Sequence, residues 1–173
     1  HNSGKMSLKA LRHKFKQANY SAVYGIGAPK LARAIGGSVK EAKALLEAYW
    51  KRNHAVLKAV ENLEVKQTGP YMWLKNPVSG FWYQLRSEKD KFSTLNQSTG
   101  VYAFDTWLYY CRAGKSKVVL QMHDEIGTYV ANNREEDNTR LLRSAIDKTN
   151  DKLKLNVKLD IDIKYGSNYA ATH

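Results

Sequence analysis

Apolar residues recur every three or four positions in the first part of the chain, which is the spacing of one face of an α-helix. In residues 6–24 this stripe consists of Leu8, Leu11, Phe15, Ala18 and Ala22. Two glycines and a proline follow within five residues and predict the end of the helix. The same criteria predict four more helices, at residues 30–35, 38–65, 91–112 and 134–153.

Runs rich in aromatic and β-branched residues predict strands between these helices. Tyr71–Lys75 and Phe81–Leu85 flank the turn sequence Asn-Pro-Val-Ser-Gly, so we expect a hairpin. Val118–Met122 and Ile126–Val130 flank His-Asp-Glu and predict a second hairpin. From Val157 to Lys164 apolar and polar residues alternate strictly, which predicts a half-buried strand. Helices together with antiparallel hairpins indicate the α+β class.

Length and composition leave room for a folded core and exclude two classes of protein. The chain has 173 residues, of which 43% are hydrophobic, so it suits one domain or a large piece of a longer protein. Its one cysteine, Cys111, excludes a disulfide scaffold. No apolar run approaches the roughly 20 residues of a membrane span, and no secretion signal is evident. We therefore expect a cytoplasmic protein, processed or cut from a longer one because it begins with His1.

Positive charge is concentrated at the start of the chain. The net charge is +12, and the first 40 residues contain eight Lys or Arg and no Asp or Glu. Such a segment points to a polyanionic partner, which could be a nucleic acid, nucleotide phosphates or an acidic membrane. A solvated basic face that serves solubility would have the same composition.

A second face of the first predicted helix carries candidate binding residues. Arg12, Lys16, Tyr20 and Tyr24 are spaced by four and form a ridge. Arginine offers a planar fork of donors and lysine a point charge, which together suit a triphosphate, while the rings could stack on a sugar or base. An ordinary exposed basic helix remains the alternative.

The second predicted hairpin has an unusual turn. Asp124 and Glu125 would lie together at its tip, where their like charges repel and where glycine or asparagine is the common choice. A divalent metal would relieve this repulsion. The alternative is a solvent-exposed acidic turn.

These motifs together resemble family A DNA polymerases. Arg12-x-x-x-Lys16-x-x-x-Tyr20-x-x-x-Tyr24-Gly25 is similar to their fingers-helix motif, and Gln-Met-His-Asp-Glu, ending at Glu125, to their palm motif. The segment Leu-Asn-Gln-Ser-Thr-Gly, residues 95–100, resembles the start of a palm helix. Gly-Ser-Asn-Tyr at 166–169, followed by the terminal His173, resembles the family's ending. The motifs stand in family order over the whole chain, and phage replicative enzymes of the T-odd type are the most similar.

The resemblance implies a role for each matching residue in nucleotide binding. Arg12 and Lys16 would hold the phosphates of the incoming nucleotide, Tyr20 would lie against its sugar and Tyr24 by the templating base. Gly25 would allow close approach. His1, with the asparagine that follows, matches an element that helps to bind phosphates, although His-Asn-Ser also matches an intein junction.

The resemblance also implies the DNA and metal contacts. Gln97 and His123 would contact the minor groove near the primer end. Asp124 would be one of two carboxylates that bind two Mg²⁺ ions, with Glu125 beside it as a further catalytic residue. The primer 3′-hydroxyl would then attack the α-phosphate of a deoxynucleoside triphosphate on primer-template DNA.

The chain departs from the family pattern mainly by an absence. The upstream Asp-x-Ser-x-Ile-Glu segment that carries the other metal-binding Asp does not occur here, and Ser21, Ser93 and Tyr169 replace usual family residues. We therefore expect helical fingers plus part of an antiparallel-sheet palm of a right-hand polymerase. Residues 1–67 would be the fingers helices, and residues 68–173 the remainder of the fingers and the palm. The chain would be inactive without the upstream palm segment, carried on the same or a separate polypeptide.

Two other functions compete with a DNA polymerase. Single-subunit RNA polymerases share the Arg-x-x-x-Lys and Tyr-Gly motifs. Their palm motif is His-Asp-Ser, whereas the third residue here is Glu125, and they tend to have Met in place of Tyr20. A non-catalytic, basic DNA-binding module would use residues 1–40 and would not require Asp124.

Overall fold

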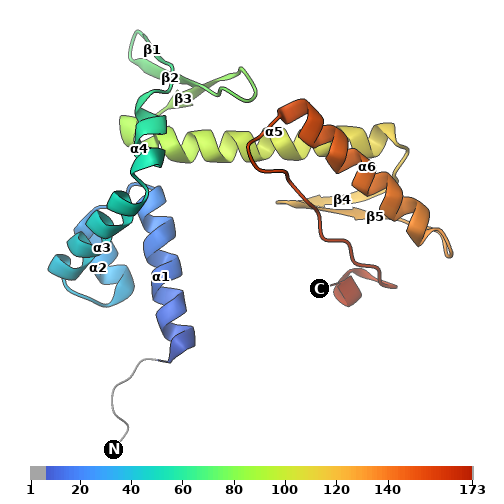
Figure 1. Ribbon diagram of the computed structural model, residues 1–173, viewed down its shortest axis with the longest axis horizontal. Helices are drawn as coiled ribbons and strands as arrows, with labels where there is room; N and C mark the ends of the chain where they lie inside the picture. The colour runs from blue at the N-terminus through green and yellow to red at the C-terminus, as the bar shows by residue number, and fades with distance from the viewer. Residues whose placement is uncertain (1–6, 173) are drawn as a thin grey trace, which may run out of the picture. The chain divides into compact units, whose positions relative to one another are not determined.

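The computed structural model describes residues 7–172, and the chain divides into two compact units after Ser98. The first unit contains four helices among its described residues, a three-stranded sheet and the first turns of α5 (Figure 1). The elements of this unit are α1 (Leu8–Val23), α2 (Ala28–Ile35), α3 (Val39–Arg52), α4 (His54–Glu61), β1 (Val65–Thr68), β2 (Tyr71–Lys75), β3 (Trp82–Leu85) and the single turn Glu88–Asp90.

The first three helices pack around a small apolar core. Ala18 and Ala22 on the last turns of α1 are buried, as are Leu31 and Ile35 on α2 and Ala42 on α3. Alanine on α1 allows the helices to approach closely. Helices α1 and α2 were predicted, and α2 begins two residues earlier than expected because Pro29 is well suited to a first helical turn.

Glycines end the first two helices by the same motif. Gly25 has φ +67° and donates its N–H to Ala22, while the Ile26 N–H bonds to Ser21. Gly36 has φ +64° and ends α2 with the equivalent bonds. This is the Schellman arrangement, which requires a left-handed residue that glycine adopts without a steric penalty.

The prediction of one helix over residues 38–65 is wrong. The helix begins as a capping box, with Ser38 accepting from the Glu41 N–H, but it is interrupted at Asn53, and α4 ends at Glu61. The Asn53 side chain donates to the Tyr49 carbonyl at 2.8 Å, so it competes with the helical backbone. Val65 instead begins β1, a strand that the apolar spacing did not predict.

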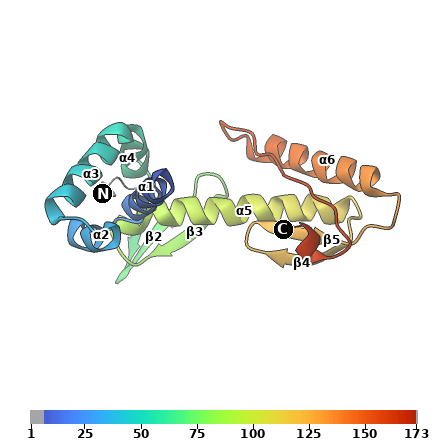
Figure 2. The same ribbon diagram turned by 90° about the horizontal axis from the view of Figure 1, so that it is seen from below.

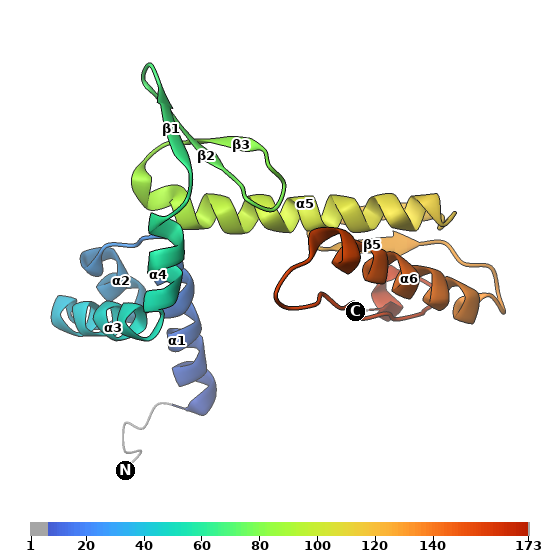
Figure 3. The same cartoon turned by 45° about the horizontal axis from the view of Figure 1, so that its top comes forward.

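The three strands form an antiparallel sheet in the order β1-β2-β3 (Figure 3). Leu74 and Leu85 on one face are fully or almost fully buried. The predicted hairpin of Tyr71–Lys75 and Phe81–Leu85 is confirmed, although β3 starts at Trp82. One face of the sheet therefore belongs to the interior, and the other is available to solvent.

A buried asparagine joins this sheet to the start of α5. Asn76 has no exposed surface; its side-chain amide donates to the Ser98 hydroxyl at 2.7 Å. Its Oδ1 accepts from the Val78 and Ser79 N–H groups at 2.8 and 3.2 Å. One side chain thus satisfies the tight turn and fixes the turn to the helix.

The second unit contains the rest of α5, a hairpin, one further helix and a final short turn. Its elements are α5 (Lys91–Ala113), β4 (Val118–Met122), β5 (Glu125–Thr128), α6 (Glu135–Leu153) and a final turn, Tyr169–Thr172. Figure 2 shows α6 beside the second half of α5. Trp107 and Cys111 on α5 meet Leu142, Ala145 and Ile146 on α6 in a common core. Burial raises the pKa of the Cys111 thiol to about 11, so it stays neutral at physiological pH.

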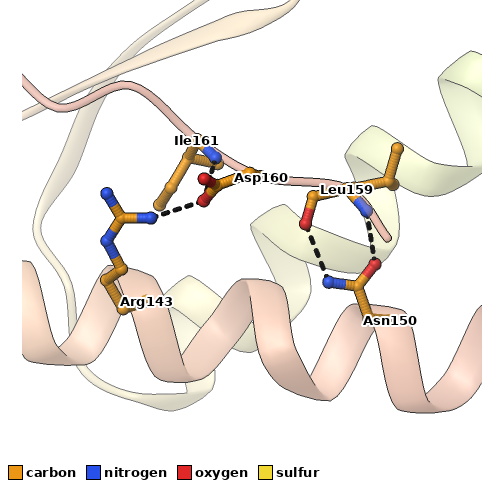
Figure 4. Close-up of polar contacts among 5 residues, drawn as sticks. All are labelled: Arg143, Asn150, Leu159, Asp160 and Ile161. Atoms are coloured by element: carbon orange, nitrogen blue, oxygen red, sulfur yellow. Dashed lines mark hydrogen bonds and ion pairs between the residues drawn. The ribbon is translucent and has the colours of Figure 1, made fainter. Parts of the chain in front are cut away.

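Residues 157–164 do not form the predicted strand, but the predicted alternation of half-buried and exposed side chains is correct. Leu159, Ile161 and Ile163 pack against the core of the second unit, yet the segment joins no sheet among the described residues. Instead, the Asn150 amide bonds both the N–H and the carbonyl of Leu159, each at 2.8 Å, and Arg143 bonds Asp160 (Figure 4). The Asn150 side chain therefore makes the hydrogen bonds to Leu159 that a neighbouring strand would make.

No helix among the described residues combines the length and apolar character that crossing a lipid bilayer requires.

We expect Asn76→Ala to lower the free energy of unfolding by roughly 2–4 kcal/mol, because it leaves the Val78 and Ser79 N–H groups without their side-chain acceptor and removes the buried hydrogen bond to Ser98. Urea denaturation measures this change. Asn96→Ala, the same substitution at an exposed position of α5, is the control and should change stability by less than about 0.5 kcal/mol. Equal effects of the two substitutions would contradict this role for Asn76.

Candidate functional site

One face of α1 forms an open hollow of about 420 Å³. The predicted ridge residues Arg12, Lys16 and Tyr20 line it, and Phe15, Asn19 and Val23 complete the lining. These six residues follow one another at intervals of three and one, which is the repeat of a single helical face. The structure therefore brings three of the predicted nucleotide-binding residues together.

The chemistry of this hollow favours an anion with an attached ring. Its lining contains two cations and no carboxylate. The Lys16 ammonium lies 5.7 Å from the centre of the Tyr20 ring, so charge and an exposed aromatic surface are adjacent. Arg12 and Lys16 are four residues apart on α1, so their side chains lie one turn apart on the same face of the helix.

The apolar stripe expected on α1 is only partly buried. Ala18 and Ala22 pack inward, whereas Leu8, Leu11 and Phe15 are 85%, 39% and 51% exposed. Phe15 also lines the cationic hollow. The sequence spacing identified the stripe correctly, but the first half of α1 extends beyond the helices that cover the second half.

A second hollow of about 360 Å³ lies at the end of α1. Tyr20 lines both hollows, and Tyr24 and Gly25 line the second together with Lys30 and Lys89. The Gln97 amide donates to the Tyr24 hydroxyl at 3.4 Å. Gly25 is required here by its positive φ rather than by crowding, since an added Cβ would come no closer than 3.6 Å to other atoms.

The palm-like hairpin places Asp124 in solvent at its tip. Met122 pairs with Glu125, so the turn has two residues, His123 and Asp124, and both are exposed. The predicted hairpin is confirmed and its first strand has the expected bounds, Val118–Met122, but the second strand is Glu125–Thr128 rather than Ile126–Val130. His123 has φ +52°, a conformation that costs a non-glycine residue roughly 1–2 kcal/mol.

Glu125 is held by the end of the chain. The Tyr169 hydroxyl donates to Glu125 Oε1 at 2.7 Å, which joins the turn at Tyr169–Thr172 to the first residue of β5. This hydrogen bond, together with the nearby carboxylate charge, raises the pKa of the Tyr169 phenol above its ordinary value. Asp124, by contrast, makes no hydrogen bond or ion pair with another residue of the described chain, and its carboxylate is exposed.

Asp124 and Glu125 offer the carboxylate oxygens that Mg²⁺ prefers. Within residues 7–172, however, no group of three or more His, Cys, Asp or Glu side chains is arranged to hold a metal ion. The hairpin therefore fits the metal as a partial set of ligands. His1 and His173 lie outside the described residues.

Several lining residues were not predicted from the sequence. Phe15, Asn19 and Val23 could have been found by extending the ridge with steps of three as well as four. Lys30 and Lys89 carry no such signal, because only the folding of α2 and of the turn after β3 brings them to Tyr24. The Tyr169 bond to Glu125 joins positions 44 residues apart and likewise has no local signature.

No family model matches the chain, and no curated protein matches it. Among solved structures it is similar to the polymerase domain of Pol1 from M. smegmatis, in complex with DNA primer-template and dNTP. The TM-score is 0.76 at 22% identity, over 97% of this chain and 32% of that one. The predicted α+β class is therefore confirmed, and the fold is similar to part of a DNA polymerase domain. This neighbour does not distinguish the T-odd type.

We expect the Tyr169 pKa to lie above about 10 and to fall toward that value in Glu125→Gln. At pH values below the ordinary tyrosine pKa, the hydrogen bond to Glu125 stabilises the folded protein. This contribution is lost as the pH rises through the raised pKa of Tyr169 in the folded state. Nuclear magnetic resonance of ¹³C-labelled tyrosine resolves the titration. Glu136→Gln, on exposed α6, is the control; an equal drop there would contradict the pairing.

Proposed function

We propose that this chain forms the fingers and part of the palm of a DNA-directed DNA polymerase, and that it serves phage DNA replication in the cytoplasm of the host. The observation that carries the proposal is the cationic hollow on α1. Its Arg12 and Lys16 share the hollow with Tyr20, which continues into the second hollow with Tyr24 and Gly25. Polymerase-like topology around this arrangement supports a nucleotidyltransferase.

Arg12 and Lys16 would bind the triphosphate of the incoming deoxynucleotide. The guanidinium can hold one phosphate by two hydrogen bonds, and the ammonium one turn later can neutralise the next. Both charges would also offset the negative charge that develops on the leaving pyrophosphate. Tyr20 would lie against the sugar, and the lining of the hollow contains no carboxylate that would repel the triphosphate.

Template and primer would be recognised by neighbouring groups. Tyr24 would lie by the templating base, with its hydroxyl fixed by Gln97, and Gly25 would leave room for that base. Gln97 would also contact the minor groove. His123, next to Asp124 in the exposed turn, would contact the primer end.

Asp124 would hold Mg²⁺ at the tip of the hairpin, with Glu125 kept in place beside it by Tyr169. The bound ions would supply Lewis-acid stabilisation to the attacking and leaving oxygens of an in-line displacement. Since the described residues contain only part of a ligand set, the other carboxylate would come from another segment of the enzyme. The primer 3′-hydroxyl would attack the α-phosphate, releasing pyrophosphate.

Lys16→Ala should weaken nucleotide use by roughly tenfold or more and leave DNA affinity nearly unchanged, because a charge-assisted phosphate contact is worth about 1.5–3 kcal/mol. Single-turnover primer extension over a range of nucleotide concentrations, with the complete enzyme, measures this. Lys43→Ala, which removes an exposed lysine from α3, is the matched control. A loss confined to DNA affinity would contradict the assignment of Lys16.

Asp124→Asn should fold and bind primer-template normally and lose nearly all chemistry, because the lost charge is needed mainly in the transition state. Glu125→Gln should be milder. Asp105→Asn makes the same substitution at an exposed site on α5 and is the control, which should leave the extension rate unchanged. Retention of most of the extension rate by Asp124→Asn would overturn the site, and preferential use of ribonucleotides by the unmodified enzyme would point to an RNA polymerase.

A further inference from the structure

The solvent-facing side of the β1-β2-β3 sheet carries rows of aromatic and cationic residues. In the strand register Lys66 lies opposite Trp73, which lies opposite Gln84. Lys75 lies opposite Trp82, and Thr68 lies opposite Tyr71. Residues opposite one another in a sheet share a face. These side chains therefore form one surface, here called the Trp-Lys face: Lys66, Thr68, Tyr71, Trp73, Lys75, Trp82 and Gln84.

Positive charge converges on this surface. The ammonium groups of Lys66 and Lys75 lie 4.0 and 5.6 Å from the centre of the same Trp82 ring. Glu64 pairs with Lys75 at 3.1 Å, whereas Lys66 has no ion pair within the described part of the chain. Two cations so close together, with a single exposed carboxylate between them, leave a net positive charge that an anion would neutralise.

The rings are available as well as the charges. Tyr71 is 52% exposed, and Trp73 and Trp82 are half-buried. The buried leucines of the sheet, Leu74 and Leu85, lie on the opposite face. Tyr71 and Trp73 lie on the same face of the antiparallel sheet, which Figure 3 shows at the start of α5, and offer rings on which flat groups can stack.

We propose that the Trp-Lys face binds single-stranded nucleic acid. Bases would stack on Tyr71 and Trp73, while Lys66 and Lys75, whose ammonium groups lie against the Trp82 ring, would bind phosphates. Alternate residues on a strand are about 6.8 Å apart, roughly twice the 3.4 Å between stacked bases. Successive bases must therefore separate from one another to reach Tyr71 and Trp73, which a single strand allows and a duplex does not. An acidic peptide would satisfy the lysines but would leave the rings unused.

The test is fluorescence anisotropy of the full-length protein with a labelled oligothymidylate of about a dozen nucleotides. Tyr71→Ala should weaken binding by about fivefold or more, and Tyr71→Phe should restore it, because stacking needs the ring and not the hydroxyl. Lys66→Glu should weaken binding by about tenfold and reduce the slope of log affinity against log salt by about 0.7. Lys148→Glu, the same charge change at an exposed position of α6, should have a much smaller effect.

Three results would overturn the proposal: no change in affinity with Tyr71→Ala, equal effects of Lys66→Glu and Lys148→Glu, or equally effective competition by a duplex or by polyglutamate. If Tyr71→Ala fails to fold by circular dichroism, Lys66→Glu and the competition assays decide. Repeating the series in a Lys16→Ala background excludes binding by the ridge on α1. The proposal does not depend on catalysis. If the protein shows this pattern of oligonucleotide binding but no primer extension, the result counts against the proposed polymerase function and not against the Trp-Lys face.

Discussion

The left-handed turn at Gly25 is the constraint on which the candidate nucleotide site depends. It ends α1 by a Schellman motif, and the chain reverses into α2 within a few residues. The reversal brings Lys30 to Tyr24 and buries Ala18 against α2 and α3. A side chain at Gly25 would meet no severe clash, but it would have to adopt φ +67°, which costs roughly 1 kcal/mol or more. Backbone conformation, rather than space, therefore accounts for glycine at this position.

The two parts of the candidate site reach their geometry by different means. On α1, helical periodicity alone aligns Arg12, Lys16 and Tyr20. At the hairpin, the short turn puts His123 into a left-handed conformation and exposes Asp124, while Glu125 depends on a hydrogen bond from Tyr169. The helix needs no distant residue to present its cations, whereas the orientation of the Glu125 carboxylate depends on the last turn of the described chain.

Elements with strong periodicity could be predicted from the sequence, and elements defined by their partners could not. The spacing in α1, α5 and α6 gave their bounds to within about two residues. Asn53 interrupted a continuous apolar pattern, because its side chain bonds the backbone in a way that apolar spacing does not encode. Alternation at Leu159 and Ile161 predicted which residues face the core, but not that Asn150 would take the place of a neighbouring strand. The candidate residues were found by motif, and Lys89 and Tyr169 were missed because only tertiary folding brings them to the site.

Because α1 is buried unevenly, a rotation of the helix about its packed end displaces its exposed end much more. Its second half is fixed by Ala18 and Ala22, whereas the half that carries Leu8 and Leu11 extends into solvent. At 1.5 Å per residue, Arg12 lies about 18 Å from Tyr24 along the axis, so a rotation of about 10° at the Gly25 end displaces Arg12 by about 3 Å and Tyr24 hardly at all. That displacement is the length of a hydrogen bond. A small angular change at the fixed end would therefore shift Arg12 by the length of a hydrogen bond and leave Tyr24 almost in place.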